Sequence, residues 1–147
     1  MKKIVSLLII IVLLASCNEY QKALKSEDPA VKLAMATKMY EAKNYNKAIR
    51  IFEQIASVYR GKPESENLYF MFSQSYYNTK QYYLAGYQFE SFVSSFPKSE
   101  KAQEASFLGA KSYSMLSPVY SLDQTDTTKA IEKLQAFIDT YPNSEYL

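Results

Sequence analysis

The sequence is informative first through the residue types that it lacks. It has no histidine, no tryptophan and a single cysteine among 147 residues. Histidine is the commonest general base and metal ligand, and one cysteine cannot form an intramolecular disulfide, so most catalytic, metal-binding and disulfide-stabilised classes are excluded. Only three glycines are present, which gives little support to strands joined by tight glycine turns. We therefore expect an all-α protein that is not an enzyme and needs no cofactor or metal.

An excess of charge of one sign is also lacking. Lysine and arginine number 17 against 15 acidic residues, and two of the lysines lie in a segment that we expect to be removed. Binding to nucleic acid needs a clustered basic surface, so we expect neither a nucleic-acid partner nor a polybasic membrane patch. Aromatic residues are abundant instead, with 14 tyrosines and eight phenylalanines, and an aromatic-rich helical chain is the simplest interpretation.

Residues 1–16 have the features of a lipoprotein signal peptide. Met1-Lys2-Lys3 is a short positive start, and residues 4–14 are apolar except for one serine. This apolar stretch is too short to span a bilayer, which takes about 20 residues, and is typical of a secretory signal. It ends in Leu14-Ala15-Ser16-Cys17, which resembles the lipobox of bacterial lipoproteins. Cys17 is therefore the predicted lipidation site, and its acyl chains would hold the protein on a membrane.

The residues after Cys17 predict how the anchor is connected and sorted. Residues 17–28 are polar without a clear apolar period, and we interpret them as a lipidated tether. Asn18 is not the aspartate that favours retention in the inner membrane of Gram-negative bacteria, so resemblance to their sorting rules indicates the outer membrane. We expect a lipid-anchored protein that faces the periplasm, and the alternative of a surface-facing protein stays open.

A repeat is visible in the spacing of the prolines. Pro29, Pro63 and Pro97 are each 34 residues apart, which is the period of the tetratricopeptide repeat, a unit of two helices. Apolar residues give an independent test, because those of residues 45–59 recur 37 residues later and again after a further 45. The longer second offset indicates an insertion at residues 116–126. The sequence therefore predicts an α-solenoid of three helical hairpins over residues 29–147, with units at 29–62, 63–97 and 98–142 and the start of a further unit at 143–147.

The apolar spacing and the capping residues also predict the helix boundaries. Asp28, Asn44, Ser99 and Asp126 are suitable N-caps. We expect the apolar side of the last helix to be uncovered unless a further repeat or a partner packs on it. The expected helices are residues 30–42, 45–59, 65–79, 82–95, 100–115 and 127–140.

The candidate partner-binding residues lie in the first helix of the middle unit and in the insertion. Residues 69–72 are four consecutive large apolar residues, which cover every face of a helix, so at least one should point away from the core. The first helices of such hairpins line the concave surface, where tyrosine and methionine suit a peptide groove. The alternative is that these rings pack against neighbouring helices, and that the insertion is only a linker. The candidates are Tyr69, Ser73, Tyr76, Tyr77 and, in the insertion, Tyr120.

The sequence resembles the BamD family of outer-membrane protein assembly factors. The features that carry this resemblance are the lipobox, the tether, the hairpins, the lengthened third unit and the turn Tyr141-Pro142-Asn143-Ser144-Glu145-Tyr146. The resemblance covers the chain from Cys17, and that family has more repeats than the three found here. It implies a non-catalytic, periplasm-facing lipoprotein of the machinery that inserts β-barrel proteins into the outer membrane. The implied partners are unfolded outer-membrane proteins at the N-terminal repeats and the POTRA domains of the BamA-type barrel subunit at the C-terminal repeats.

Two other classes of function remain as alternatives. One is a general tetratricopeptide scaffold, or a glycan-binding lipoprotein at the cell surface. The other is an enzyme, which the absence of histidine, of a free thiol after lipidation and of a carboxylate pair disfavours.

Overall fold

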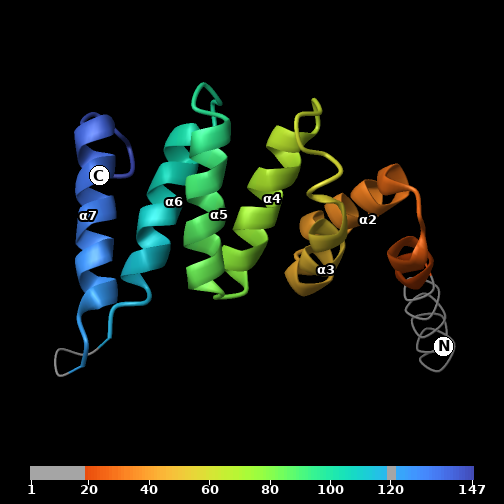
Figure 1. Cartoon of the computed structure of the whole chain (residues 1–147), viewed down its shortest axis with the longest axis horizontal. Helices are drawn as coiled ribbons and strands as arrows, with labels where there is room; N and C mark the ends of the chain where they lie inside the picture. Colours follow the sequence, from red (N-terminus) through yellow and green to blue (C-terminus); the bar gives the residue numbers. More distant parts are fainter. Residues whose placement is uncertain (1–18, 119–121) are drawn as a thin grey trace, which may run out of the picture.

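The protein is a row of antiparallel helical hairpins. The computed structural model describes residues 19–118 and 122–147, and within them every regular element is a helix. Consecutive helices pack side by side along the long axis (Figure 1), so the predicted all-α, tetratricopeptide-like solenoid is confirmed. The hairpins are formed by α2 (Pro29–Glu41) with α3 (Tyr45–Ile55), α4 (Ser65–Asn78) with α5 (Tyr82–Ser95), and α6 (Ala102–Ser114) with α7 (Thr125–Thr140).

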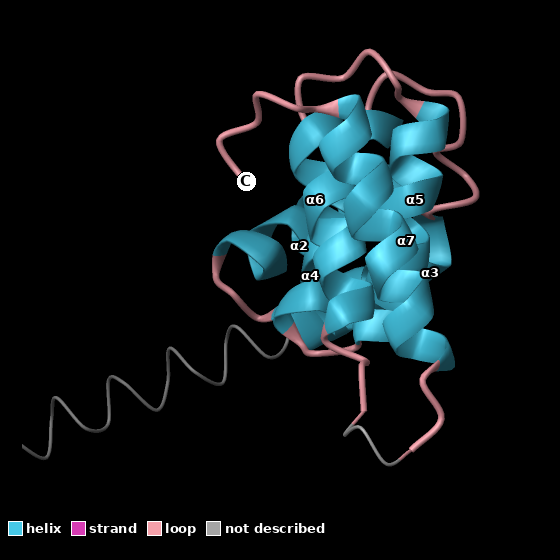
Figure 2. Cartoon of the chain, turned by 90° about the vertical axis from the view of Figure 1, so that its left-hand side faces the viewer, coloured by secondary structure: helices cyan, strands magenta, loops and turns pink. Residues whose placement is uncertain are grey.

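The connections lie at two opposite edges of this row. Seen along the long axis in Figure 2, the helices overlap and the loops gather above and below them. The turns inside the hairpins lie at one edge, and the loops between hairpins lie at the other (Figure 1). The insertion is the connection between α6 and α7, and residues 119–121 within it fall outside the described part of the chain.

A small residue, followed one turn later by an aromatic residue in the first two hairpins and by Leu134 in the third, explains the packing of the second helix of each hairpin. Ala48, Ala85 and Ala130 occupy equivalent positions and are all buried. Alanine lets a neighbouring helix approach closely, and Phe52 and Phe89, four residues later, fill the space that follows. The repeating apolar residues of the sequence are therefore core residues.

Tyrosine–glutamate hydrogen bonds connect consecutive hairpins. The Tyr76 hydroxyl on α4 donates to Glu53 Oε1 on α3 at 3.0 Å. The equivalent Tyr113 on α6 donates to Glu90 Oε2 on α5 at 3.1 Å. Glu90 also pairs with Lys133 on α7, with 2.7 Å between Nζ and Oε1. The same bond thus recurs at each described junction between hairpins.

Several boundaries differ from the sequence expectation. α3 ends at Ile55 rather than near residue 59, and residues 56–60 form turns. The Asp28 carboxylate caps α2 as predicted, accepting the Ala30 N–H at 2.8 Å. Asn44 makes no side-chain cap bond, and Asp126 lies inside α7, because the Asp123 carboxylate three residues earlier accepts the Thr125 N–H.

Two further expectations from the sequence are corrected, namely Ser99 as the N-cap of α6 and residues 17–28 as a polar tether. Ser99 lies before a turn that precedes α6, and its hydroxyl accepts the Lys101 N–H at 3.1 Å. Residues 19–25, expected to be part of a polar tether, are helical, and Tyr20 is 3% exposed. The Tyr20 hydroxyl holds this helix against α3 by donating to the Lys47 carbonyl at 3.3 Å, while Ala23 is buried and Leu24 packs against the core. The apolar spacing of these three residues spans only about one turn, which is too short to indicate a helix in the sequence.

Candidate peptide-binding groove

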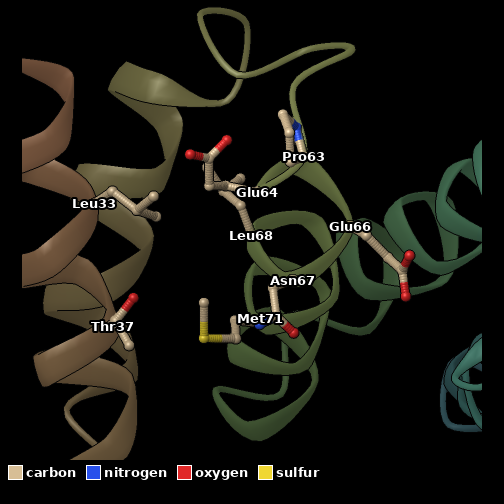
Figure 3. A pocket seen from close by; sticks show the side chains of 8 residues that line it. All are labelled: Leu33, Thr37, Pro63, Glu64, Glu66, Asn67, Leu68 and Met71. Atoms are coloured by element: carbon tan, nitrogen blue, oxygen red, sulfur yellow. The ribbon is translucent and has the colours of Figure 1, made fainter.

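A pocket of about 550 Å³ lies between α2 and α4, the first helices of the first two hairpins. Leu33 and Thr37 come from α2, and Asn67 and Met71 come from α4 (Figure 3). The pocket therefore has apolar side chains on both walls and an amide that can donate to or accept from a peptide backbone. Its remaining lining residues are Pro63, Glu64, Glu66 and Leu68.

Two hydrogen-bonded contacts extend the polar surface of this groove along the first helices. The Tyr40 hydroxyl of α2 donates to Gln74 Oε1 of α4, and Gln74 Nε2 donates to Glu104 Oε1 of α6 at 3.1 Å. Burial raises the pKa of the Tyr40 hydroxyl, and the nearby Tyr45 and Glu104 raise it further. Tyr40 therefore stays a neutral donor, and Gln74 links the first helices of all three hairpins.

The carboxylates at the top of the pocket differ in direction. Glu64 lies over the space between the two helices, whereas Glu66 points away toward α6 (Figure 3). Glu66 accepts a hydrogen bond from the Ser99 hydroxyl at 2.7 Å, so it is occupied by the protein itself. The pocket therefore offers apolar contact from Leu33 and Met71 and hydrogen-bonding groups from Asn67 and Glu64.

The predicted residues of α4 lie on other faces of that helix. Ser73 is fully buried, and its hydroxyl donates to the Tyr69 carbonyl at 2.8 Å. Tyr76 is also buried against Glu53, so the expectation that these two residues line the concave surface is wrong. The reason is that α4 lies between other helices, and most of its large residues are needed to fill the space on both sides.

Tyr69 and Tyr77 are half-buried and keep part of their rings accessible. The Tyr69 hydroxyl donates to the Ala56 carbonyl at 2.8 Å. Its ring lines a different hollow, of about 740 Å³, on the side of the second helices, together with Tyr87 and Phe96. The Tyr77 ring meets Tyr82 edge-on, with 5.7 Å between ring centroids. Partner binding by Tyr69 and Tyr77 stays a prediction.

Two further predicted residues, Cys17 and Tyr120, lie outside the described residues. Among residues 19–118 and 122–147, no three histidine, cysteine, aspartate or glutamate side chains lie close enough together to hold a metal ion.

The family of the chain is shown by its similarity to known proteins. The YfiO family, described as outer membrane lipoprotein, matches residues 27–147. The chain belongs to the YfiO family. This match covers all three hairpins and includes the insertion, which makes the groove part of a YfiO domain. No curated protein is significantly similar to the chain. In the described part of this YfiO chain, no helix has the length and apolar character needed to cross a bilayer.

The groove residues Asn67 and Met71, which sequence reasoning missed, share one face of α4 with Gln74 and Asn78. Asn67, Met71, Gln74 and Asn78 recur at intervals of four, three and four residues, which places them on one face of a helix. Three of the four are amides, and none is fully buried. A stripe of amide residues beside an aromatic stripe is a signal that could have identified the concave face of this YfiO protein.

Proposed function

We propose that this YfiO-family lipoprotein acts without catalysis in the assembly of outer-membrane β-barrel proteins, and that it is anchored to the outer membrane through Cys17 and faces the periplasm. The observation that carries the proposal is the α2–α4 groove in a chain of this family. An extended segment of an unfolded barrel protein offers alternating apolar side chains and free backbone amides. Leu33 and Met71 can contact the apolar side chains of such a segment, and the Asn67 amide can hydrogen-bond to its backbone.

Crosslinking from the groove tests this function. A photo-reactive amino acid in place of Met71 would lie in the groove, and the same residue in place of the exposed Ser94 on α5 would lie outside it. We expect Met71 to crosslink unfolded barrel proteins during their assembly and Ser94 to crosslink none. Equal crosslinking at both positions would contradict the groove assignment.

A second experiment tests the partners of the whole protein. The lipidated chain is used to recover bound proteins from detergent-solubilised outer membranes, with Cys17→Ala as the unanchored control and mass spectrometry as the readout. Recovery of a BamA-type subunit with POTRA domains, or of unfolded barrel proteins, supports the proposal. Recovery of glycan-uptake or secretion proteins alone would favour the scaffold or glycan-binding alternatives.

A further inference from the structure

Two turns of the solenoid place three lysines at one edge. Lys43 belongs to the α2–α3 turn, Lys47 lies in the first turn of α3, and Lys80 belongs to the α4–α5 turn. Residues of both turns line a shared open hollow of about 470 Å³. We call residues 42–47 and 78–84 the basic edge. It contains no acidic residue, and the nearest one in the sequence is Glu41 at the end of α2.

The opposite edge of the same two hairpins has a mixed charge. Its loops, residues 56–64 and 96–101, carry four basic and two acidic side chains. The basic edge differs in that its three lysines have no acidic residue among them, which the near-neutral composition of the whole chain does not reveal. The charged residues of the opposite edge are Arg60, Lys62, Glu64, Lys98, Glu100 and Lys101.

Two of the lysines hold a backbone conformation that favours glycine. Lys43 has φ 58° and Lys80 has φ 61°, in the left-handed region that lysine rarely adopts. Each closes a helix in the same way, since the next N–H bonds a carbonyl five residues back, Asn44 to Met39 and Gln81 to Tyr76. Lysine at both equivalent positions costs stability, and such a cost points to a use for the side chains.

Exposed aromatic and apolar residues accompany the lysines. Tyr83 is 64% exposed, and Leu84 follows it on the first turn of α5. The α6–α7 connection lies at this same edge (Figure 1) and adds Met115, the 61% exposed Leu122 and one acidic residue, Asp123. Lysine, tyrosine and scattered apolar side chains are the residue types that occur at the level of lipid headgroups.

The chain before Tyr20 limits how far the edge can be from the lipid anchor. Tyr20 is only three residues after Cys17, a reach of at most about 11 Å for an extended chain. The Tyr20 ring is fixed at the basic edge, with Lys47 Nζ 5.2 Å from its centroid. The acyl chains of Cys17 are therefore held close to the end of the basic edge that includes Lys47.

We propose that the basic edge docks on the anionic phospholipid headgroups of the membrane that holds the anchor. The lysine ammonium groups contact lipid phosphates, Tyr83 and Leu122 reach the headgroup level, and the solenoid stands with its other edge away from the bilayer. This inference rests on the proposed lipid anchor at Cys17, and it adds an orientation and a lipid preference that the anchor alone does not give.

Site-specific fluorescence tests the orientation. Cys17 is the only cysteine of the chain, and lipidation uses its thiol, so an introduced cysteine is the only one that can be labelled. Asn46→Cys places a dye in the first turn of α3 and Ser57→Cys places one just after its C-terminus, at exposed positions about 16 Å apart along the helix direction. The lipidated full chain is reconstituted in phosphatidylcholine vesicles, with or without one-fifth phosphatidylglycerol, that contain lipid with a nitroxide headgroup.

We expect the dye at Asn46 to be quenched several-fold more than the dye at Ser57 in vesicles with phosphatidylglycerol. Combining Lys43→Gln, Lys47→Gln and Lys80→Gln should remove most of this difference. The control variant combines Arg60→Gln, Lys62→Gln and Lys98→Gln, which removes the same number of positive charges from the opposite edge. It should preserve the difference in quenching between the two dye positions. Equal quenching at both positions, or a difference that persists without phosphatidylglycerol, overturns the proposal.

Two measurements separate this result from failure of the fold or of the anchor. Lys43→Gly with Lys80→Gly should reduce the quenching at Asn46 and yet raise the Tm, since glycine accepts the left-handed turns; an unchanged quenching overturns the proposal. The mass of the purified chain reports the acyl groups on Cys17. A chain without them overturns both the anchor and the docking, whereas an acylated chain that fails the quenching test overturns the docking alone.

Discussion

At the scale of single residues, close approach between hairpins depends on glycine at one position of α5. A Cβ atom on Gly86 would lie 2.9 Å from Cζ of the Tyr113 ring. That ring cannot retreat freely, because its hydroxyl is bonded to Glu90 and Lys129 Nζ lies 4.2 Å from its centroid. The glycine therefore allows α6 to pack closely on α5.

Gly86→Ala should lower the free energy of unfolding, although alanine is the better helix former by about 1 kcal/mol. The overlap with the Tyr113 ring should cost about 1–3 kcal/mol, the usual range for an overpacked core. Urea unfolding followed by circular dichroism measures the change.

A double-mutant cycle supplies the control. Gly86→Ala combined with Tyr113→Leu should cost less than the sum of the two single changes, because the shorter side chain leaves room for the methyl group. Additive costs would show that the ring does not limit the approach of α6.

At the scale of elements, the first two hairpin turns store strain in their lysines. Lys80→Gly should raise the free energy of unfolding by about 1 kcal/mol, because glycine has no Cβ to oppose a φ of 61°. Lys80→Ala keeps the Cβ and removes the exposed side chain beyond it, as glycine also does, so it is the matched control and should change stability little. A higher Tm for the alanine variant than for the glycine variant would contradict this explanation.

The position of a helix in the row decides how much an equivalent residue contributes. Ile49 on α3 is 5% exposed, whereas Ile131, at the equivalent position of α7, is 63% exposed. In this chain we expect Ile49→Ala to cost about 2–5 kcal/mol of unfolding free energy, and Ile131→Ala to stay within about 0.5 kcal/mol. Denaturant unfolding of both variants tests this, and similar losses would mean that the face of α7 is covered in solution.

The elements themselves were largely predictable, but the faces of α4 were not. Apolar spacing located all six helices of the hairpins within a few residues, since burial of one stripe is a local property of a helix. The assignment of Ser73 and Tyr76 to a groove was wrong because four large residues in a row give no preferred face. Only the neighbours of α4 decide which of them is covered.

At the scale of the whole molecule, tyrosines at several junctions couple stability to alkaline pH. Burial raises the pKa of the Tyr76 hydroxyl above its usual value near 10, and the hydrogen bond to Glu53 raises it further. Burial and Glu90 act in the same direction on the pKa of Tyr113. Above pH 10 the unfolded chain therefore loses protons that the folded chain retains, and this favours unfolding.

We expect stability to change little on account of these tyrosines below about pH 9 and to fall as the pH rises above about 10. Urea unfolding between pH 8 and pH 11 measures the slope. Tyr76→Phe combined with Tyr113→Phe removes two of the responsible hydroxyls and should make the fall shallower. A slope unchanged by both substitutions would assign the effect to other groups.

The sequence by itself determined the helical class, the hairpin repeat and the place of the insertion, because each depends on local spacing, whereas the lipidation of Cys17 stays a prediction from a short motif. The tertiary structure alone decided which face of α4 lines the groove, that Tyr20 anchors the tether helix, and that Lys43, Lys47 and Lys80 share an edge. The composition predicted no basic patch, since the charges nearly balance. The total numbers of basic and acidic residues do not show which turns come to lie on the same side of the protein when the hairpins stack.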